Sequence, residues 1–125
     1  MNARSARSGR IVFSAAFAVV SMLGSQASQA HHGWGDYDDK QPLTLKARVV
    51  ELTYANPHAS VVIDAGGKRW NAILAPISRM ESRGASRQAL EANQEITVVG
   101  YPSRTTPGEM RVERVILGDK TVELR

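Results

Sequence analysis

Residues 43–54 read Leu-Thr-Leu-Lys-Ala-Arg-Val-Val-Glu-Leu-Thr-Tyr, and this stretch decides the fold class. Apolar and polar side chains alternate in its first half, which is the period of a half-buried β-strand. The phase then shifts, because Val50, Leu52 and Tyr54 form the next apolar set. A phase shift inside one long strand predicts a β-bulge or sharp coil that lets the strand serve two parts of a curved sheet.

Strand-like patterns recur after the break at Asn56-Pro57. We expect strands at residues 60–64, 68–74, 96–102, 111–117 and 121–124. Gly66-Gly67 tolerates the positive φ angles of a tight hairpin turn between the second and third strands. Before the fourth strand, Ser78 and Glu81 have the spacing of a helix capping box, and Gly84 can end that helix.

The predicted order is three strands, a short helical connection and two or three further strands. This is the order of an OB-fold, a small Greek-key barrel with a helix between its third and fourth strands. The sequence therefore predicts an all-β, OB-like barrel over residues 43–125. A different small β-sandwich or an open β-roll is the alternative.

Residues 1–30 have the pattern of a secretory signal peptide. Three arginines precede an apolar block at residues 11–24, and small residues follow. Fourteen apolar residues are fewer than the roughly 20 that a membrane-spanning helix needs. We expect cleavage after Ala30, with cleavage after Ala27 as the alternative, and thus a periplasmic or secreted protein without a stable membrane anchor. Residues 31–42 are polar and are expected to form an extended N-terminal arm.

The charge of the chain is mostly a property of its first thirty residues. The 125 residues carry sixteen Lys and Arg and twelve Asp and Glu, for a net charge of +4. Removal of the three arginines of the signal peptide leaves +1, with acids and bases interleaved. This balance argues against nucleic-acid binding. The absence of cysteine excludes disulfides and thiolate metal sites.

His31, His32 and His58 are the candidate metal ligands. A chain that starts at His31 offers an α-amine and an imidazole in one chelate ring, and both can be neutral ligands near neutral pH. An all-nitrogen site favours Cu(II) by the Irving–Williams order. If Ala30 were retained, His32 would stand third, as in a square-planar amino-terminal copper site. The alternative is that His31 and His32 are a solvated dipeptide and that His58 is an ordinary loop residue.

A second set of residues is expected to line a ligand-binding side of the barrel. In OB-folds the loop between the first two strands and the loop after the fourth strand lie on that side. The candidates near these loops are Tyr54, Asn56, Trp70, Tyr101 and Arg104. Core packing is the alternative for the aromatic residues. No serine stands in a nucleophile elbow and no pattern pairs His58 with a nucleophile, so we expect no enzyme activity.

Several short motifs resemble one known family. Ala-His-His at residues 30–32, Asn-Pro-His-Ala at 56–59 and the Gly-Tyr-Pro loop at 100–102 are similar to an uncharacterised family of small exported bacterial proteins, a domain of unknown function. Two positions depart from it, since Tyr54 stands where the family often has Trp and Asn93 replaces a usual glycine. The resemblance implies the fold and export, and it implies no activity.

The sequence thus predicts a small exported binding or accessory protein that binds a transition metal such as Cu(II) through its histidines. The alternative is a metal-independent module that binds a periplasmic protein or a small ligand.

Overall fold

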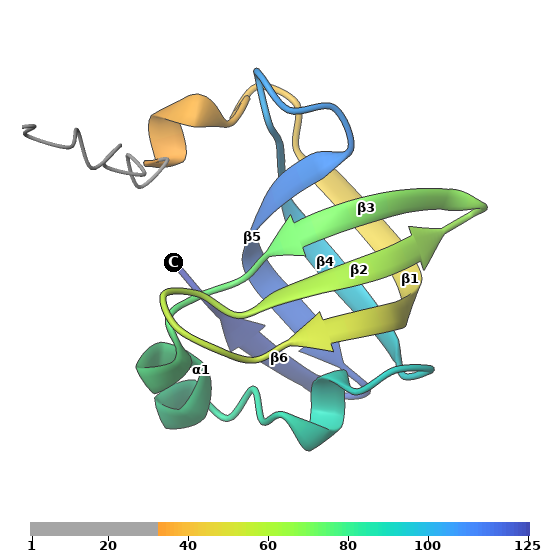
Figure 1. Cartoon of the computed structure of the whole chain (residues 1–125), viewed down its shortest axis with the longest axis vertical. Coiled ribbons are helices and arrows are strands. Elements are labelled where there is room, and N and C mark those ends of the chain that lie inside the picture. Colours follow the sequence, from red (N-terminus) through yellow and green to blue (C-terminus); the bar gives the residue numbers. More distant parts are fainter. Residues whose placement is uncertain (1–32) are drawn as a thin grey trace, which may run out of the picture. The chain divides into compact units, whose positions relative to one another are not determined.

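A computed structural model describes residues 33–125 (Figure 1). The predicted signal peptide, both cleavage positions, His31 and His32 lie outside the described residues. In chain order the elements are η1 (Trp34–Asp36), β1 (Leu43–Thr53), β2 (Ser60–Ala65), β3 (Lys68–Ile73), α1 (Ile77–Arg83), η2 (Gln88–Leu90), β4 (Glu95–Pro102), β5 (Glu109–Leu117) and β6 (Lys120–Glu123). Here η marks a 3₁₀ helix. No helix within residues 33–125 is long and apolar enough to cross a membrane.

The first five strands close into a barrel. The hydrogen-bonded order is β3-β2-β1-β4-β5-β6, and β3 also pairs with β5. The β3–β5 pair is parallel and the other pairs are antiparallel. With α1 between β3 and β4, this is the predicted OB-like arrangement of a small barrel. The prediction is confirmed, and the β3–β5 pairing rules out the alternative of an open sheet.

Closure depends on the coiling of β1. Its first half, from Leu43 to Arg48, pairs with β4, and its second half, from Arg48 to Thr53, pairs with β2. The register against β2 shifts between Val49 and Glu51, so the predicted bulge is confirmed. The expectation that Val50 is part of the inward apolar set is wrong. Val50 is the extra residue of the bulge and is 36% exposed.

The connection between β3 and β4 closes one end of the barrel. Met80 of α1 and Leu90 of η2 are fully buried in the core. Gly84 ends α1 in the left-handed conformation, as predicted, with φ of 83°. The predicted capping box is wrong, because α1 follows Pro76, and this places Ser78 inside the first turn, where it cannot cap the helix.

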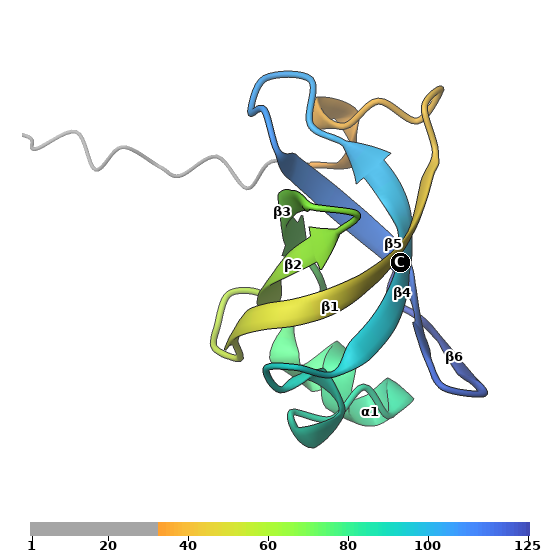
Figure 2. The same ribbon diagram turned by 90° about the vertical axis from the view of Figure 1, so that its right-hand side faces the viewer.

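The barrel has two structurally different ends. In both views, α1 and η2 lie at one end, and residues 34–42 with the β4–β5 loop lie at the other (Figures 1 and 2). Between them, inward side chains of the strands fill the core, among them Ile63, Val98, Met110 and Val112. The two ends therefore offer separate surfaces for functional sites.

Gly100 allows the close approach of β4 and β5. A Cβ atom at Gly100 would lie 2.8 Å from the carbonyl carbon of Arg111 and 2.9 Å from the Cα atom of Val112, which are backbone atoms that cannot rotate away. We expect Gly100→Ala to lower the free energy of unfolding by about 3 kcal/mol, at the upper end of typical overpacking costs. Urea unfolding of the purified protein measures this. Gly35→Ala is the matched control, since its Cβ would meet no atom within 4 Å, and an equal effect of both substitutions would contradict the prediction.

Candidate functional site

The described part of the expected N-terminal arm, residues 33–42, is folded against the barrel. The backbone N–H of Asp38 donates to the carbonyl of Pro102 at 2.9 Å, and that of Arg104 donates to the carbonyl of Asp36 at 2.9 Å. Tyr37 forms an isolated β-bridge with Ser103 and is only 3% exposed. The expectation of an extended arm is corrected for these residues. The burial of one aromatic side chain, within a stretch that reads as polar, holds the segment in place.

The hydroxyl of Tyr37 donates to the carboxylate of Glu109 at the start of β5, at 2.8 Å. Burial raises the pKa of the Tyr37 phenol well above its usual range, and the adjacent Glu109 raises it further. The phenol is therefore a neutral donor, and it links the N-terminal segment to the strand that closes the barrel.

Trp34 precedes Tyr37 and lies among basic and aromatic side chains. Its ring centroid is 6.2 Å from that of Tyr101, in an edge-to-face arrangement. The guanidinium carbon of Arg111 lies 4.8 Å from the Trp34 centroid, and that of Arg125 lies 4.6 Å from it. Both distances are within the range of cation–π attraction. Trp34 thus joins the N-terminal segment to β4, β5 and the C-terminal residue.

These residues surround a cleft of about 190 Å³, which we call the Trp34 cleft. It is lined by Trp34, Gly35, Tyr37, Asp39, Tyr101, Arg104 and Arg125. Its charges are compensated within the protein, because Arg104 lies 3.5 Å from Asp38 and 3.8 Å from Asp39, and Arg125 lies 3.7 Å from Glu113. A ligand here would meet aromatic edges and guanidinium groups that already have partners.

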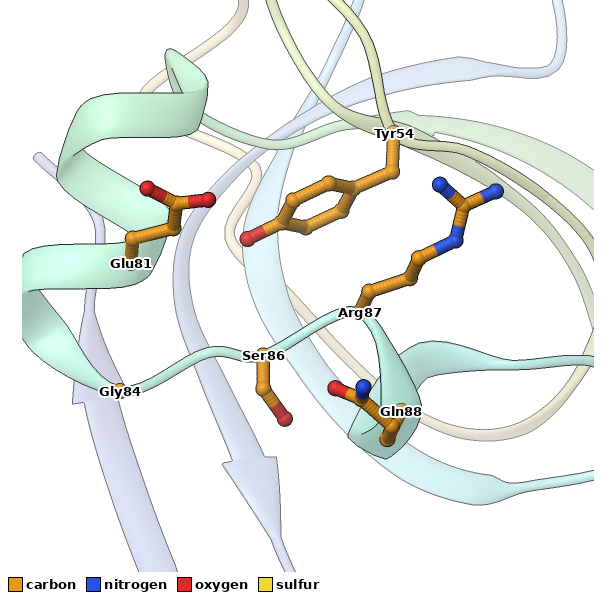
Figure 3. Close-up of a pocket in the computed structure, with 6 residues that line it drawn as sticks. All are labelled: Tyr54, Glu81, Gly84, Ser86, Arg87 and Gln88. Atoms are coloured by element: carbon orange, nitrogen blue, oxygen red, sulfur yellow. The ribbon is translucent and has the colours of Figure 1, made fainter.

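A larger pocket of about 400 Å³ lies at the end of the barrel where α1 and η2 pack (Figure 3). We call it the Tyr54 pocket, and it is lined by Tyr54, Glu81, Gly84, Ser86, Arg87 and Gln88. The hydroxyl of Tyr54 donates to the carbonyl of Ala85 at 3.1 Å. Burial raises the pKa of the Tyr54 phenol, and the negative charge of Glu81 adds to this effect.

The five residues predicted to bind a ligand do not form one site. Tyr101 and Arg104 share the Trp34 cleft, whereas Tyr54 lines the pocket at the α1 end. Trp70 is half-buried against the core with the Lys68 ammonium 4.1 Å from its ring centroid, which agrees with the alternative of core packing. Asn56 is exposed at a cis peptide bond to Pro57. The expectation that the β1–β2 and β4–β5 loops share one binding side is corrected.

His58 is the one candidate metal ligand that the described residues include. It is half-buried at the end of the β1–β2 loop. The next residue, Ala59, is fully buried and forms backbone hydrogen bonds with Leu74 and Ala75, just before α1. Within residues 33–125, no three His, Asp or Glu side chains are grouped so as to hold a metal ion.

Four of the lining residues of the two pockets are not among the predicted site residues. Trp34 stands two residues after the Ala-His-His motif and has no predicted role. Arg125 and Arg87 are charged residues that belong to no predicted site, and Glu81 was expected only as part of a helix capping box, so only the folding of the chain brings the three to an aromatic ring. No local sequence signal identifies such residues.

The comparison with known families matches residues 18–110 to a family of unknown function, DUF6152. The chain belongs to this family. The match spans most of the chain, including His31, His32 and His58, and it confirms the resemblance to an uncharacterised family. No curated protein matches the chain. The family carries no activity that could be transferred, so any function has to be inferred from the residues themselves.

The Tyr37 hydroxyl allows a test of how firmly the N-terminal segment is held. At pH 7 we expect Tyr37→Phe to lower the free energy of unfolding by about 1.5 kcal/mol, because a hydrogen bond to a carboxylate is lost. The raised pKa in the folded state means that the contribution of Tyr37 is complete below about pH 10, the pKa of an unperturbed phenol, and is lost as the pH rises through the folded-state value. The variant should therefore lose less stability than the wild type above pH 10.

Urea unfolding at pH 7 and at pH 10.5 measures both effects. Tyr101→Phe is the comparison, since the Tyr101 hydroxyl also donates to a carboxylate, that of Glu113 at 3.0 Å, from a half-exposed position. An identical alkaline loss of stability in wild type and Tyr37→Phe would contradict the prediction.

Proposed function

We propose that the protein is a small exported accessory protein that binds Cu(II) at its processed N-terminus. Cleavage after Ala30 would give His31 a free α-amine. The amine and imidazole of His31 would form one chelate ring, and His32 would add a second imidazole. His58, the third predicted ligand, precedes Ala59, which pairs with residues just before α1 at the end of the barrel opposite residues 34–42, so the proposed site consists of the histidine pair. Neutral nitrogen ligands of this kind suit Cu(II) better than the other common divalent ions.

The observation that carries the proposal is the docking of residues 34–38 on the barrel. Tyr37 is buried and Trp34 contacts Tyr101 and two guanidinium groups. Gly33 adjoins this fixed point, and His32 directly precedes Gly33 in the sequence. The histidine pair would then start from an anchored position, and less conformational entropy would be lost when it closes around a metal ion.

Export and processing are tested by mass spectrometry of the chain recovered outside the cytoplasm. The proposal requires a first residue of His31, or Ala30 for the square-planar variant of the site. A chain that begins at Ser28 would remove the amine from the histidine pair and contradict the chelate.

Metal binding is tested by Cu(II) titration of the processed protein and its histidine variants. We expect one Cu(II) per chain and a loss of affinity of at least about tenfold in the double variant His31→Ala, His32→Ala, because even supporting residues of metal sites contribute this much. We expect His58→Ala to bind Cu(II) as the wild type does, because His58 lies beside α1, at the end of the barrel opposite residues 34–42. Equal, weak binding by the wild type and the double variant would overturn the proposal.

A metal-independent interaction module is the second candidate function. The observation in its favour is that Tyr101 and Arg104, both expected to bind a ligand, meet Trp34 and Arg125 in one cleft. Aromatic and arginine side chains are enriched at the centres of protein interfaces.

For this candidate we expect one defined partner to copurify with the protein in the presence of a chelator. Arg104→Ala should abolish the copurification, and Arg69→Ala, at an exposed position on β3, should leave it intact. A partner that is lost on chelation would favour the metal-binding function instead.

A further inference from the structure

The Tyr54 pocket contains one acidic and one basic side chain whose charged groups make no contact that stabilises the described part of the fold. Among residues 33–125, neither the Glu81 carboxylate nor the Arg87 guanidinium takes part in an ion pair or a side-chain hydrogen bond. By contrast, Arg79 and Arg83 of the same region donate to backbone carbonyls near the C-terminus. The charges of Glu81 and Arg87 are thus available to a bound molecule.

The aromatic ring between them fixes how such a molecule would lie. Figure 3 shows the Tyr54 side chain between the Glu81 carboxylate, near its hydroxyl end, and the Arg87 guanidinium, near its backbone end. The Tyr54 hydroxyl is held by the carbonyl of Ala85, so the ring is a fixed wall of the pocket. The volume of about 400 Å³ is within the range of pockets that hold small molecules.

We propose that the Tyr54 pocket binds a short zwitterionic peptide, with its terminal ammonium at Glu81 and its terminal carboxylate at Arg87. A guanidinium binds a carboxylate through two parallel hydrogen bonds, and an ammonium pairs with a carboxylate as a point charge. In a free amino acid the ammonium and carboxylate groups are attached to the same carbon atom, so these two groups cannot lie on both sides of the Tyr54 ring. A peptide carries them at opposite ends, and a side chain between them can pack on Tyr54.

This site is separate from the proposed metal site. It uses none of the three histidines, and its lining residues come from α1, the connection from α1 to η2, the start of η2 and the residue that follows β1. Failure of copper binding would therefore leave this proposal standing, and failure of peptide binding would not affect the metal site.

The test uses the tripeptide Gly-Phe-Gly in four forms: with free termini, N-acetylated, C-amidated, and blocked at both ends. Titration of the isotope-labelled processed protein, followed by NMR, gives the dissociation constants and the amides that respond. We expect the free peptide to shift the amides of residues 54 and 81–88. Each single block should weaken binding by about tenfold, the loss of one charge-assisted contact.

Two conservative variants assign each end of the peptide. Glu81→Gln should weaken the binding of the free peptide by about the same factor as N-acetylation does. It should not weaken the binding of the acetylated peptide any further. Arg87→Gln should weaken the binding of the free peptide by about the same factor as C-amidation does, and it should not weaken the binding of the amidated peptide any further. The controls are Glu51→Gln on β1 and Arg69→Gln on β3, both at exposed positions outside the pocket, and they should leave the affinity unchanged.

All four substitutions replace exposed side chains, so the variants should fold as the wild type does. Several results would overturn the proposal: equal binding of free and blocked peptides, unchanged affinity in Glu81→Gln and Arg87→Gln, or shifts that map outside the pocket. Absence of any response at millimolar peptide would also overturn it.

Discussion

The bulge in β1 is the constraint on which the rest of the structure depends. One strand has to pair with β4 along its first half and with β2 along its second, and the extra residue Val50 supplies the change of direction between them. With β1 coiled in this way, β3 reaches β5 and the barrel closes. The same coiling separates the two ends of β1. One end leads back to the docked N-terminal segment, and the other leads through Tyr54 to the pocket at α1.

Closure of the barrel also determines how the N-terminal segment is held. The β4–β5 loop returns the chain to β5 beside that segment, so Ser103 and Arg104 pair with its backbone, and Glu109 accepts a hydrogen bond from Tyr37. The contacts of Trp34 add Arg125 from the end of the chain. Residues from both ends of the described chain and from the β4–β5 region thus meet at one cleft. In such a cluster, the loss of one aromatic side chain removes several contacts together.

Much of the fold could be predicted from the sequence, because strand period, turn glycines and the bulge are local properties. The phase shift near Val50, the hairpin at Gly66-Gly67 and the helix end at Gly84 all followed from single residues or short patterns. The docked segment could not be predicted, since the burial of Tyr37 depends on partners more than sixty residues away. The distribution of the predicted ligand residues over two surfaces could not be predicted for a related reason. The analogy with other OB-folds predicts that Tyr54 and Tyr101 lie together. Tyr54 follows the end of β1, whereas Tyr101 is next to Gly100, which pairs with Leu43 at the start of β1, and the two tyrosines therefore line different surfaces.

The Trp34 cleft and the Tyr54 pocket differ in whether their charged side chains have ion-pair partners within the protein. This difference says more about their roles than their volumes do. In the Trp34 cleft, Arg104 and Arg125 have carboxylate partners and Tyr101 donates to Glu113, so these groups hold the protein together and would have to be released before they could bind a charged ligand. In the Tyr54 pocket, Glu81 and Arg87 remain in solvent without ion-pair partners within residues 33–125. An incoming charge there replaces only water. Ion pairs within the protein favour a structural role for the Trp34 cleft, in which it holds residues 34–38 against the barrel. Charged side chains without such partners favour ligand binding at the Tyr54 pocket.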